Sequence, residues 1–456
     1  MVDSRFATLV DQMRTGAIDR RTFLVRGAAL GISAGALMRA MPAMAQDASP
    51  AAAGGGSDEL VPENLGVAGI EHSTDTSKGT INLYSSWPMT GASEQIGGDS
   101  AESVRLAIEL WGGAAGGFAI NYEALDDGVA ANQGSWDAAK EAENASMVVN
   151  DQDAVAYIAT YNSGAAEAAI PITNEAGLAQ ISPANTAVQL TKESPANPEG
   201  YPDVLYPTGE RNYMRVVPAD DLQGSAGANF AFNTLGAQTA YILHDQQTYG
   251  RGVAESFQAT FVELGGEILG FEGFDPNAPE YQALMTKIAS TGPQLVYLGA
   301  IVNLNASKLL QDFRGLLSPE ETAFMGPDGL LNQAFVDGAG DAAEGAYITF
   351  GGLPANALEG PGAVWAETMR ERLGHEPDAY AAYSFEAAVV VLQAIDAVGE
   401  KDRAKILETM FNTTDFRGLT NTWSFTETGD PDTATLSVNI VKDGEITFGE
   451  TISPPE

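Results

Sequence analysis

Short apolar runs alternate with longer segments of mixed character along most of the chain, beginning at Thr80. The short runs predict strands, and the longer segments, in which apolar residues recur every three or four positions, predict helices. In the segment 93–111, for example, Val104, Ala107 and Ile108 fall on one helical face. Strands separated by helices of this length predict parallel sheets with right-handed crossovers.

The alternation runs through the chain twice. The first round predicts helices at 93–111, 135–149 and 165–175 and strands at 81–86, 118–125, 154–160, 178–181 and 214–217. The second round predicts helices at 222–235, 252–264, 280–290 and 306–315 and strands at 239–243, 267–271, 295–298, 322–325 and 346–350. The remainder predicts helices at 363–373, 379–398 and 403–411, a strand at 422–425 and a hairpin at 437–447. Two successive sheets of this kind predict an α/β protein with two doubly wound lobes.

Two polar turns follow neighbouring strands of the first round, at 161–164 and 182–186. The first turn also opens a helix, whose first N–H groups are unpaired and whose dipole favours negative charge, and Ser163 adds a hydroxyl donor. Ligands of open α/β sheets lie beyond the carboxyl ends of the strands, so a small carboxylate is expected between Ser163 and Thr186. The turns alone leave a second interpretation open, in which Ser163 only caps a helix and Ser182-Pro183 only turns the chain.

The amino terminus has the sequence pattern of an export signal. Arg20-Arg21 is followed by an apolar run at 27–38 and by Ala43-Met44-Ala45, a small-x-small cleavage pattern. The run is too short for a membrane span of about 20 residues. We predict a twin-arginine signal peptide at 1–45, a flexible Ala/Gly/Ser-rich spacer at 46–79, and export to the periplasm or cell surface with no stable membrane insertion after cleavage.

Composition narrows the class of partner. Of 456 residues, 23 are basic, 61 acidic and none is cysteine. Without residues 1–45 the chain keeps 17 basic and 58 acidic residues, a net charge of −41. Such a surface repels nucleic acid and anionic lipid, so neither is expected as a partner, and no disulfide or thiolate chemistry is available.

Nothing in the sequence indicates an enzyme. The three histidines, His72, His244 and His375, have no Ser or Asp partner at the spacing of a catalytic motif. No phosphate-binding loop and no Gly-x-Gly-x-x-Gly after a strand occurs, and Asp151-Gln152-Asp153 lacks the spacing of a calcium loop. We therefore expect no catalytic residues, no cofactor and no metal.

Four segments, in order, carry a family resemblance: ISPANT at 181–186, LHD with YGRG at 243–252, FMGPDG at 324–329 and GDAAEG at 340–345. Over about residues 80–450 they resemble the leucine/isoleucine/valine-binding proteins of ABC importers, which have the type I periplasmic binding fold. The resemblance implies a monomer with a hinged cleft that closes on a free amino acid and delivers it to a permease. It also implies lobe 1 at 80–218 plus 351–422 and lobe 2 at 219–350 plus 423–456.

The resemblance also implies site residues. Ser163 and Thr186 match positions that bind the ligand's α-carboxylate, with the backbone of Ala184 and Thr186 and the neighbouring Asn162 sharing contacts. Asp328 matches the acid that pairs with the α-ammonium, and Tyr249 matches an aromatic wall from the second lobe. A zwitterion needs donors on one side and an acceptor on the other, which agrees with these roles. Standing alone, Pro327-Asp328-Gly329 would be read as a turn.

The sequence departs from the family in the side-chain pocket. Ile96 and Ile301 stand where the family often has aromatic residues, so we expect an apolar pocket of altered size for a branched-chain or other apolar amino acid. The loop at 193–210 is either a rim of the cleft or a surface loop. An alternative remains, in which the same fold binds an amide, urea or a small aromatic or aliphatic carboxylate for transport or sensing. A ligand without an ammonium group would leave Asp328 buried and unpaired.

Overall fold

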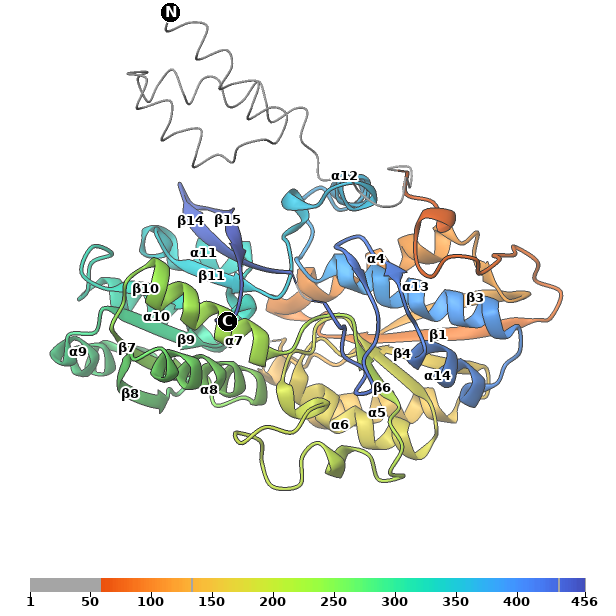
Figure 1. Cartoon of the computed structure of the whole chain (residues 1–456), viewed down its shortest axis with the longest axis horizontal. Coiled ribbons are helices and arrows are strands. Elements are labelled where there is room, and N and C mark those ends of the chain that lie inside the picture. The colour runs from red at the N-terminus through yellow and green to blue at the C-terminus, as the bar shows by residue number, and fades with distance from the viewer. Residues whose placement is uncertain (1–58, 133, 434, 456) are drawn as a thin grey trace, which may run out of the picture. The chain divides into compact units, whose positions relative to one another are not determined.

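The computed structural model describes residues 59–132, 134–433 and 435–455. The predicted signal peptide and the first part of the predicted spacer lie outside the described residues. Two sheets, each covered by helices on both faces, make up the described chain (Figure 1).

The first sheet forms lobe 1 and has six strands in the order β2-β3-β1-β4-β5-β6. All its pairs are parallel except β2 with β3. Helices α5 and α6 cover one face, and α4, α13 and α14 the other. The strands are β1 (Thr80–Trp87), β2 (Ala114–Ala115), β3 (Phe118–Asp126), β4 (Ala154–Ala159), β5 (Ala179–Ser182) and β6 (Tyr213–Arg215). The helices are α4 (Glu94–Leu110), α5 (Ala138–Asn150), α6 (Ser163–Glu175), α12 (Pro361–Leu373), α13 (Ala381–Val398) and α14 (Arg403–Phe411).

The second sheet forms lobe 2 and has seven strands in the order β15-β14-β11-β10-β9-β7-β8. The five strands from β11 to β8 in this order are parallel, and the β14-β15 hairpin adds an antiparallel edge. The strands are β7 (Thr239–His244), β8 (Glu267–Gly273), β9 (Leu295–Gly299), β10 (Ala323–Gly326), β11 (Tyr347–Phe350), β14 (Leu436–Lys442) and β15 (Glu445–Ile452). The helices are α7 (Asp220–Asn229), α8 (Thr248–Glu263), α9 (Gln282–Thr291), α10 (Ser307–Arg314) and α11 (Gln333–Ala339).

The chain passes between the two sheets three times, from β6 to α7, from β11 to α12, and from the small β12-β13 ladder (Phe416–Arg417, Thr422–Trp423) to β14. This confirms the predicted α/β class with two doubly wound lobes. A buried ion pair ties two of the crossings together, because Arg215 Nε lies 2.7 Å from Asp430 Oδ1 and both side chains are almost fully buried. The backbone oxygens of Asn185 and Ala187 accept hydrogen bonds from the same guanidinium group.

Helix α13 is the central core element of lobe 1. Its sequence is apolar around nearly the whole circumference, which is typical of a helix covered on all sides. By length and composition it could cross a membrane, but 83% of it is buried inside the protein. Its burial in the core accounts for the composition.

Most element ends differ from the predicted ones by a few residues. Helix α8 begins at Thr248 and not at 252, which places Tyr249 in its first turn. Asp245 closes the preceding turn, since its carboxylate accepts a hydrogen bond from the Gln247 N–H at 2.9 Å. The short α11 and the two-residue β2 and β12 had no periodicity long enough to predict them.

The second part of the predicted spacer differs from the prediction, because residues 60–78 pack against lobe 1. Leu65 is 1% exposed, and the Val67 N–H donates to Gln393 Oε1 of α13 at 2.8 Å. His72 Nδ1 lies 3.0 Å from Asp396 Oδ2, farther along the same helix. Composition did not reveal this because the polar partners lie more than 300 residues away in the sequence.

The loop at 193–210 packs against lobe 1 as a surface loop. Leu205 and Tyr206 join Ala166 and Ile170 of α6 in a small apolar cluster. The Tyr206 hydroxyl donates to the Leu190 oxygen at 2.6 Å. The loop does not line the cavity described below.

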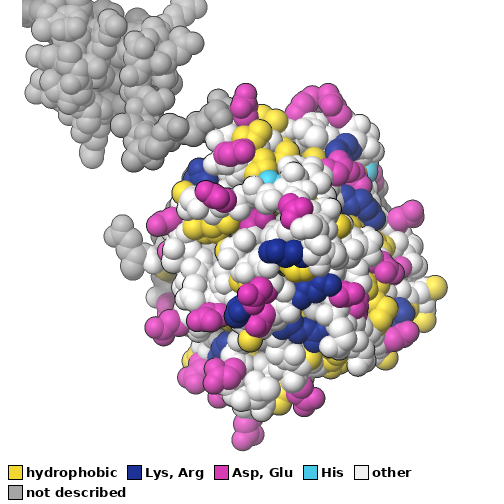
Figure 2. Space-filling model, turned by 90° about the vertical axis from the view of Figure 1, so that its right-hand side faces the viewer, with side chains coloured by type: hydrophobic (Ala, Val, Ile, Leu, Met, Phe, Trp, Pro, Cys, Tyr) yellow, Lys and Arg dark blue, Asp and Glu magenta, His cyan; other side chains and the backbone are white. Residues whose placement is uncertain are grey.

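The surface shows the expected excess of acid. On the face seen in Figure 2, at the lobe 1 end of the molecule, acidic side chains surround a smaller number of Lys and Arg side chains. The exposed ion pairs here contribute little to stability individually.

A pair of buried acids lies beneath the cleft side of lobe 1. Asp127, directly after β3, is 0% exposed, and neither of its oxygens has a hydrogen-bond partner among the described residues. Burial, then the charge of Glu141, raises the pKa of Asp127 well above its usual value. Burial also raises the pKa of Glu141 to about 7, although Ser86 and Tyr157 donate to its carboxylate at 2.5 and 2.9 Å. The folded protein therefore holds protons here that the unfolded chain would release.

The raised pKa values of Asp127 and Glu141 predict that the stability of the protein depends on pH. A raised pKa means that the folded state binds the Glu141 proton more tightly, so the free energy of unfolding should fall as pH rises from about 4.5 to about 7. Glu141→Gln mimics the protonated acid. Over this pH range its free energy of unfolding should fall by on the order of 1 to 3 kcal/mol less than that of the wild type. Denaturant unfolding at pH 5 and pH 8 measures it. The matched control is Glu143→Gln on the same helix, whose side chain is 71% exposed; equal pH profiles for the two variants would contradict the assignment.

Candidate functional site

Asp328 is the carboxylate on which the two lobes meet. It follows β10, opens a short 3-10 helix and is 7% exposed. Tyr249 donates its hydroxyl to Asp328 Oδ1 at 2.7 Å, Gln223 donates to the same oxygen, and Tyr380 donates to Oδ2. Burial raises the pKa of Asp328, while the hydrogen bonds from Tyr380, Gln223 and Tyr249 oppose the rise.

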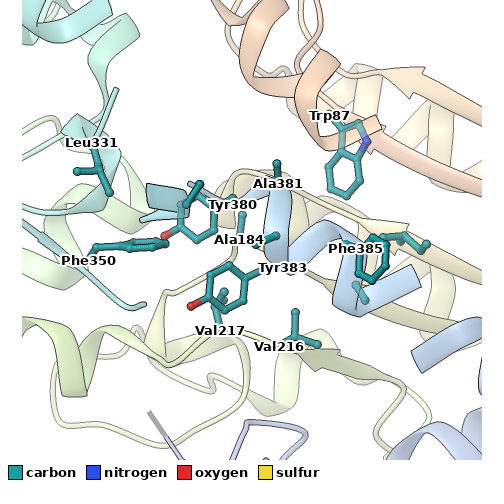
Figure 3. Close-up of a cluster of buried hydrophobic side chains, with 14 of the residues drawn as sticks. Trp87, Ala184, Val216, Val217, Leu331, Phe350, Tyr380, Ala381, Tyr383 and Phe385 are labelled. Carbon is teal, nitrogen blue, oxygen red and sulfur yellow. The ribbon is translucent and has the colours of Figure 1, made fainter. Parts of the chain in front are cut away.

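Tyr380 of lobe 1 makes a direct contact with lobe 2. It lies immediately before α13, and its ring meets Phe350 of β11 edge to face with centroids 5.3 Å apart. It also meets Tyr161 edge to face, with centroids 5.5 Å apart. Figure 3 shows Tyr380 and Tyr383 reaching from the start of α13 toward Phe350. The hydroxyl that donates to Asp328 is thus fixed by aromatic packing on both sides.

Tyr249, predicted as an aromatic wall, takes a polar role in the structure. Its hydroxyl donates to Asp328 and accepts the Gly329 N–H at 2.8 Å, which orients both groups. The ring is 8% exposed.

The two polar turns of lobe 1 lie close together, as the sequence predicted. Ser182 Oγ accepts the Ala184 N–H at 3.1 Å and the Asn185 N–H at 2.9 Å, which closes the second turn. Ser163 opens α6, and its Oγ accepts the Ala187 N–H at 3.3 Å, which joins the first turn to the second.

This side of the site holds buried polar atoms that lack a hydrogen-bond partner among the described residues. Asn162 Oδ1 is buried and has no hydrogen-bond partner among the described residues; Thr186 Oγ1 has none by hydrogen-bond geometry, although it lies close enough to Asp220 to lower the pKa of that acid. Buried polar atoms in proteins are almost always paired, so unpaired atoms at a strand edge point to a ligand.

Between the lobes lies a small cavity of about 30 Å³. Four of the predicted site residues line it, namely Ile96, Asn162, Ile301 and Asp328. Ser163, Ala184, Thr186 and Tyr249 are buried beside it and do not line it. The predicted side-chain contacts and the ammonium partner therefore face one space, while the carboxylate partners lie at its margin.

Residues that the sequence interpretation missed complete the site. They are Asp378, which lines the cavity, Tyr380 and Gln223, which donate to Asp328, and Asp220. Burial raises the pKa of Asp378 to about 7. The segments carrying these residues were read only as helix starts, and nothing in their spacing indicated that they meet at Asp328.

Asp220, the first residue of α7, is fully buried. Its N–H donates to the Thr186 oxygen at 2.8 Å. Burial, then the charge of Asp328, raises the pKa of Asp220 well above its usual value, and the Thr186 hydroxyl opposes the shift. The acid pair Asp220-Asp221 before an apolar segment was recognisable as a helix start, but its burial was not.

Two further contacts hold the lobes together at the rim. Thr248 Oγ1 of α8 donates to Glu167 of α6 at 3.2 Å, and Asn303 donates to Ser93. In residues 59–132, 134–433 and 435–455, no group of three or more His, Asp or Glu side chains is arranged to hold a metal ion.

Residues 81–445 match the periplasmic binding protein family. The chain belongs to this family. An amino acid binding protein of Pseudomonas aeruginosa is 28% identical over 268 residues, which span 58% of this chain and 66% of that protein. A leucine binding protein of Thermotoga maritima superposes with a TM-score of 0.72 at 25% identity, covering 82% of this chain and 99% of that one. A solute binding protein from R. palustris, solved with benzoate, superposes with a TM-score of 0.68 at 20% identity, covering 82% and 97%.

Proposed function

We propose that this protein is the extracytoplasmic solute-binding component of an ABC importer and that it binds a free branched-chain or other apolar L-amino acid. It delivers the ligand to a membrane permease and acts as a monomer without enzymatic activity of its own. The observation that carries the proposal is Asp328, a buried carboxylate that receives hydrogen bonds from elements of both lobes.

The arrangement suits a zwitterion. On the lobe 1 side, the start of α6 at Ser163 and the hydroxyl of Thr186 offer donors for a carboxylate. On the lobe 2 side, Asp328 offers only acceptor oxygens to an ammonium group. Charge-assisted hydrogen bonds of this kind contribute about 1.5 to 3 kcal/mol each.

Lobe closure follows from the size of the cavity. A space of about 30 Å³ holds roughly one water molecule, far less than a small-molecule pocket of about 300 Å³ or more. Entry of an amino acid therefore requires the lobes to separate, which breaks the contacts between Thr248 and Glu167 and between Tyr380 and Asp328. Since each lobe supplies part of the contacts, the ligand then favours a closed state by its differential affinity.

Two kinds of relative bear on the ligand class. The similar protein of Thermotoga maritima is named for leucine, whereas the one from R. palustris was solved with benzoate. Benzoate has no cationic group, and binding it here would leave the buried Asp328 without a counter-charge, which is costly. The acids of the site therefore favour an amino acid.

Isothermal titration calorimetry against the twenty amino acids tests the proposal directly. We expect binding of leucine, isoleucine or valine with a dissociation constant in or below the micromolar range. Heat from urea, an amide or benzoate, with none from any amino acid, would replace the ligand class by the alternative one.

Asp328→Ala should weaken amino-acid binding by about 3 to 5 kcal/mol, because the ligand's ammonium would be buried without its partner. Calorimetry measures the change, and Asp341→Ala, an exposed acid of the same lobe, serves as the control. A loss under about 0.5 kcal/mol for Asp328→Ala, the scatter of an uninvolved surface position, would remove this residue from the site.

We further propose export through the twin-arginine pathway and a location in the periplasm or at the cell surface. A reporter fused to residues 1–45 should leave the cytoplasm, and replacing Arg20 and Arg21 by Lys should block export. Cell fractionation of the two fusions measures this. Unchanged export of the Lys-Lys fusion would indicate a different route.

A further inference from the structure

Helix α6 of lobe 1 and helix α8 of lobe 2 are in contact at the rim of the cleft. Thr248, the first residue of α8, donates its hydroxyl to Glu167 Oε2 of α6 at 3.2 Å. Both side chains are half-buried. The hydrogen bond therefore joins an acid of one lobe to the N-terminus of a helix in the other lobe.

The first turn of α8 has no side-chain cap from its own lobe. Gln247 occupies the N-cap position without a side-chain hydrogen bond to the helix, and the first turn contains no acid. The carboxylate of Asp245 lies just before the helix, where it accepts the N–H groups of Gln247 and Ile301. The N–H groups at the start of a helix carry partial positive charge, which a nearby carboxylate stabilises. Glu167 thus supplies from across the cleft the acid that the first turn of α8 lacks.

Glu167 is held in position within lobe 1. Gln189, in the short 3-10 helix Val188–Leu190, donates to Glu167 Oε1. The other carboxylate oxygen is the one that accepts from Thr248. Glu167 lies beyond the first turn of α6, which contains no acid, so it does not cap its own helix. When the lobes separate, Glu167 keeps its partner in lobe 1 and water can replace the Thr248 hydroxyl, which makes the contact between the lobes reversible.

The contact lies close to the predicted ligand partners of both lobes. Tyr249, the residue after Thr248, donates to Asp328 Oδ1 at 2.7 Å. Ser163 lies four residues before Glu167 on α6, which is about one helical turn. A hydrogen bond between Glu167 and Thr248 therefore constrains how far the proposed carboxylate partner in lobe 1 lies from the proposed ammonium partner in lobe 2.

We propose that Glu167 and Thr248 form a latch, a reversible hydrogen bond between the lobes that stabilises the closed state without touching the ligand. Neither residue lines the cavity, so both are positioning residues. The proposal rests on the proposed function, in which the closed state holds the ligand, and extends it to two side chains outside the ligand site. Because the apparent affinity of a ligand falls with the fraction of protein in the binding-competent state, weakening the latch weakens ligand binding.

A purely structural role for Glu167 makes a different prediction. Its hydrogen bond from Gln189 lies within lobe 1, so losing that bond would lower the stability of the ligand-free protein and leave closure unchanged. Thr248→Val separates the two roles, because it removes the hydroxyl in lobe 2 and leaves Glu167 and Gln189 in place. A latch predicts that the Thr248 variant loses affinity as the Glu167 variant does.

The test uses Glu167→Ala, Thr248→Val and the double variant in the full-length mature protein, with leucine, isoleucine or valine as the probe, whichever wild type binds most tightly. We expect each single variant to weaken binding about 3- to 10-fold in calorimetry, chiefly through faster dissociation in stopped-flow measurements. The double variant should bind about as weakly as the weaker single variant, because both substitutions remove the same hydrogen bond. The matched controls are Glu175→Ala, at the exposed end of α6, and Thr286→Val, exposed on α9. Both controls should stay within about twofold of wild type.

Three results would overturn the latch: affinities within about twofold of wild type in both single variants, effects that multiply in the double variant, or a loss of affinity that parallels a fall in the ligand-free melting temperature. Small-angle X-ray scattering of the ligand-free protein supplies a readout that needs no ligand, since loss of the latch should increase the radius of gyration. If wild type binds none of the twenty amino acids, the proposed function fails, and scattering still tests the latch. An unchanged radius of gyration in both single variants would then overturn it as well.

Discussion

The structure depends on one buried carboxylate shared between two lobes. Asp328 is held at the end of a lobe 2 strand, yet one of its donors, Tyr380, comes from the beginning of the core helix of lobe 1. A buried acid is stable only with donors around it, so the two lobes are complementary at this point.

Several acids buried near the cleft have no ion pair with a basic side chain among the described residues. Asp220, Asp328 and Asp378 are all buried in this region, and the pKa of each is raised chiefly by burial. In a chain of net charge −38 the long-range field favours a positive group at the same place. The interior near the cleft is therefore electrostatically favourable for a cation.

The lobes are joined by more interactions where the chain crosses between them than at the rim. Arg215 and Asp430 form a buried, multiply bonded pair between two of the crossings. At the rim, in contrast, the lobes meet through single hydrogen bonds such as that from Thr248 to Glu167. Removing one partner of the buried pair would leave an uncompensated charge, whereas the rim contacts can exchange with water at little cost.

The sequence by itself determined the architecture, because the periodicity of strands and helices is a local property of the chain. It also marked the turns at Ser163 and Thr186 as neighbours, since strand ends of parallel sheets gather at one edge. Asp328 was predicted only from the resemblance of its motif to the binding-protein family. Only the tertiary structure decided which other groups reach that edge. Tyr380 and Asp328 are 52 residues apart, Gln223 and Asp328 are 105 apart, and residues 60–78 pack on a helix more than 300 residues away. Contacts of that range depend on how helices pack over the sheets, and no local pattern records them; the burial of Asp220, which looks like an ordinary helix start, is the clearest case.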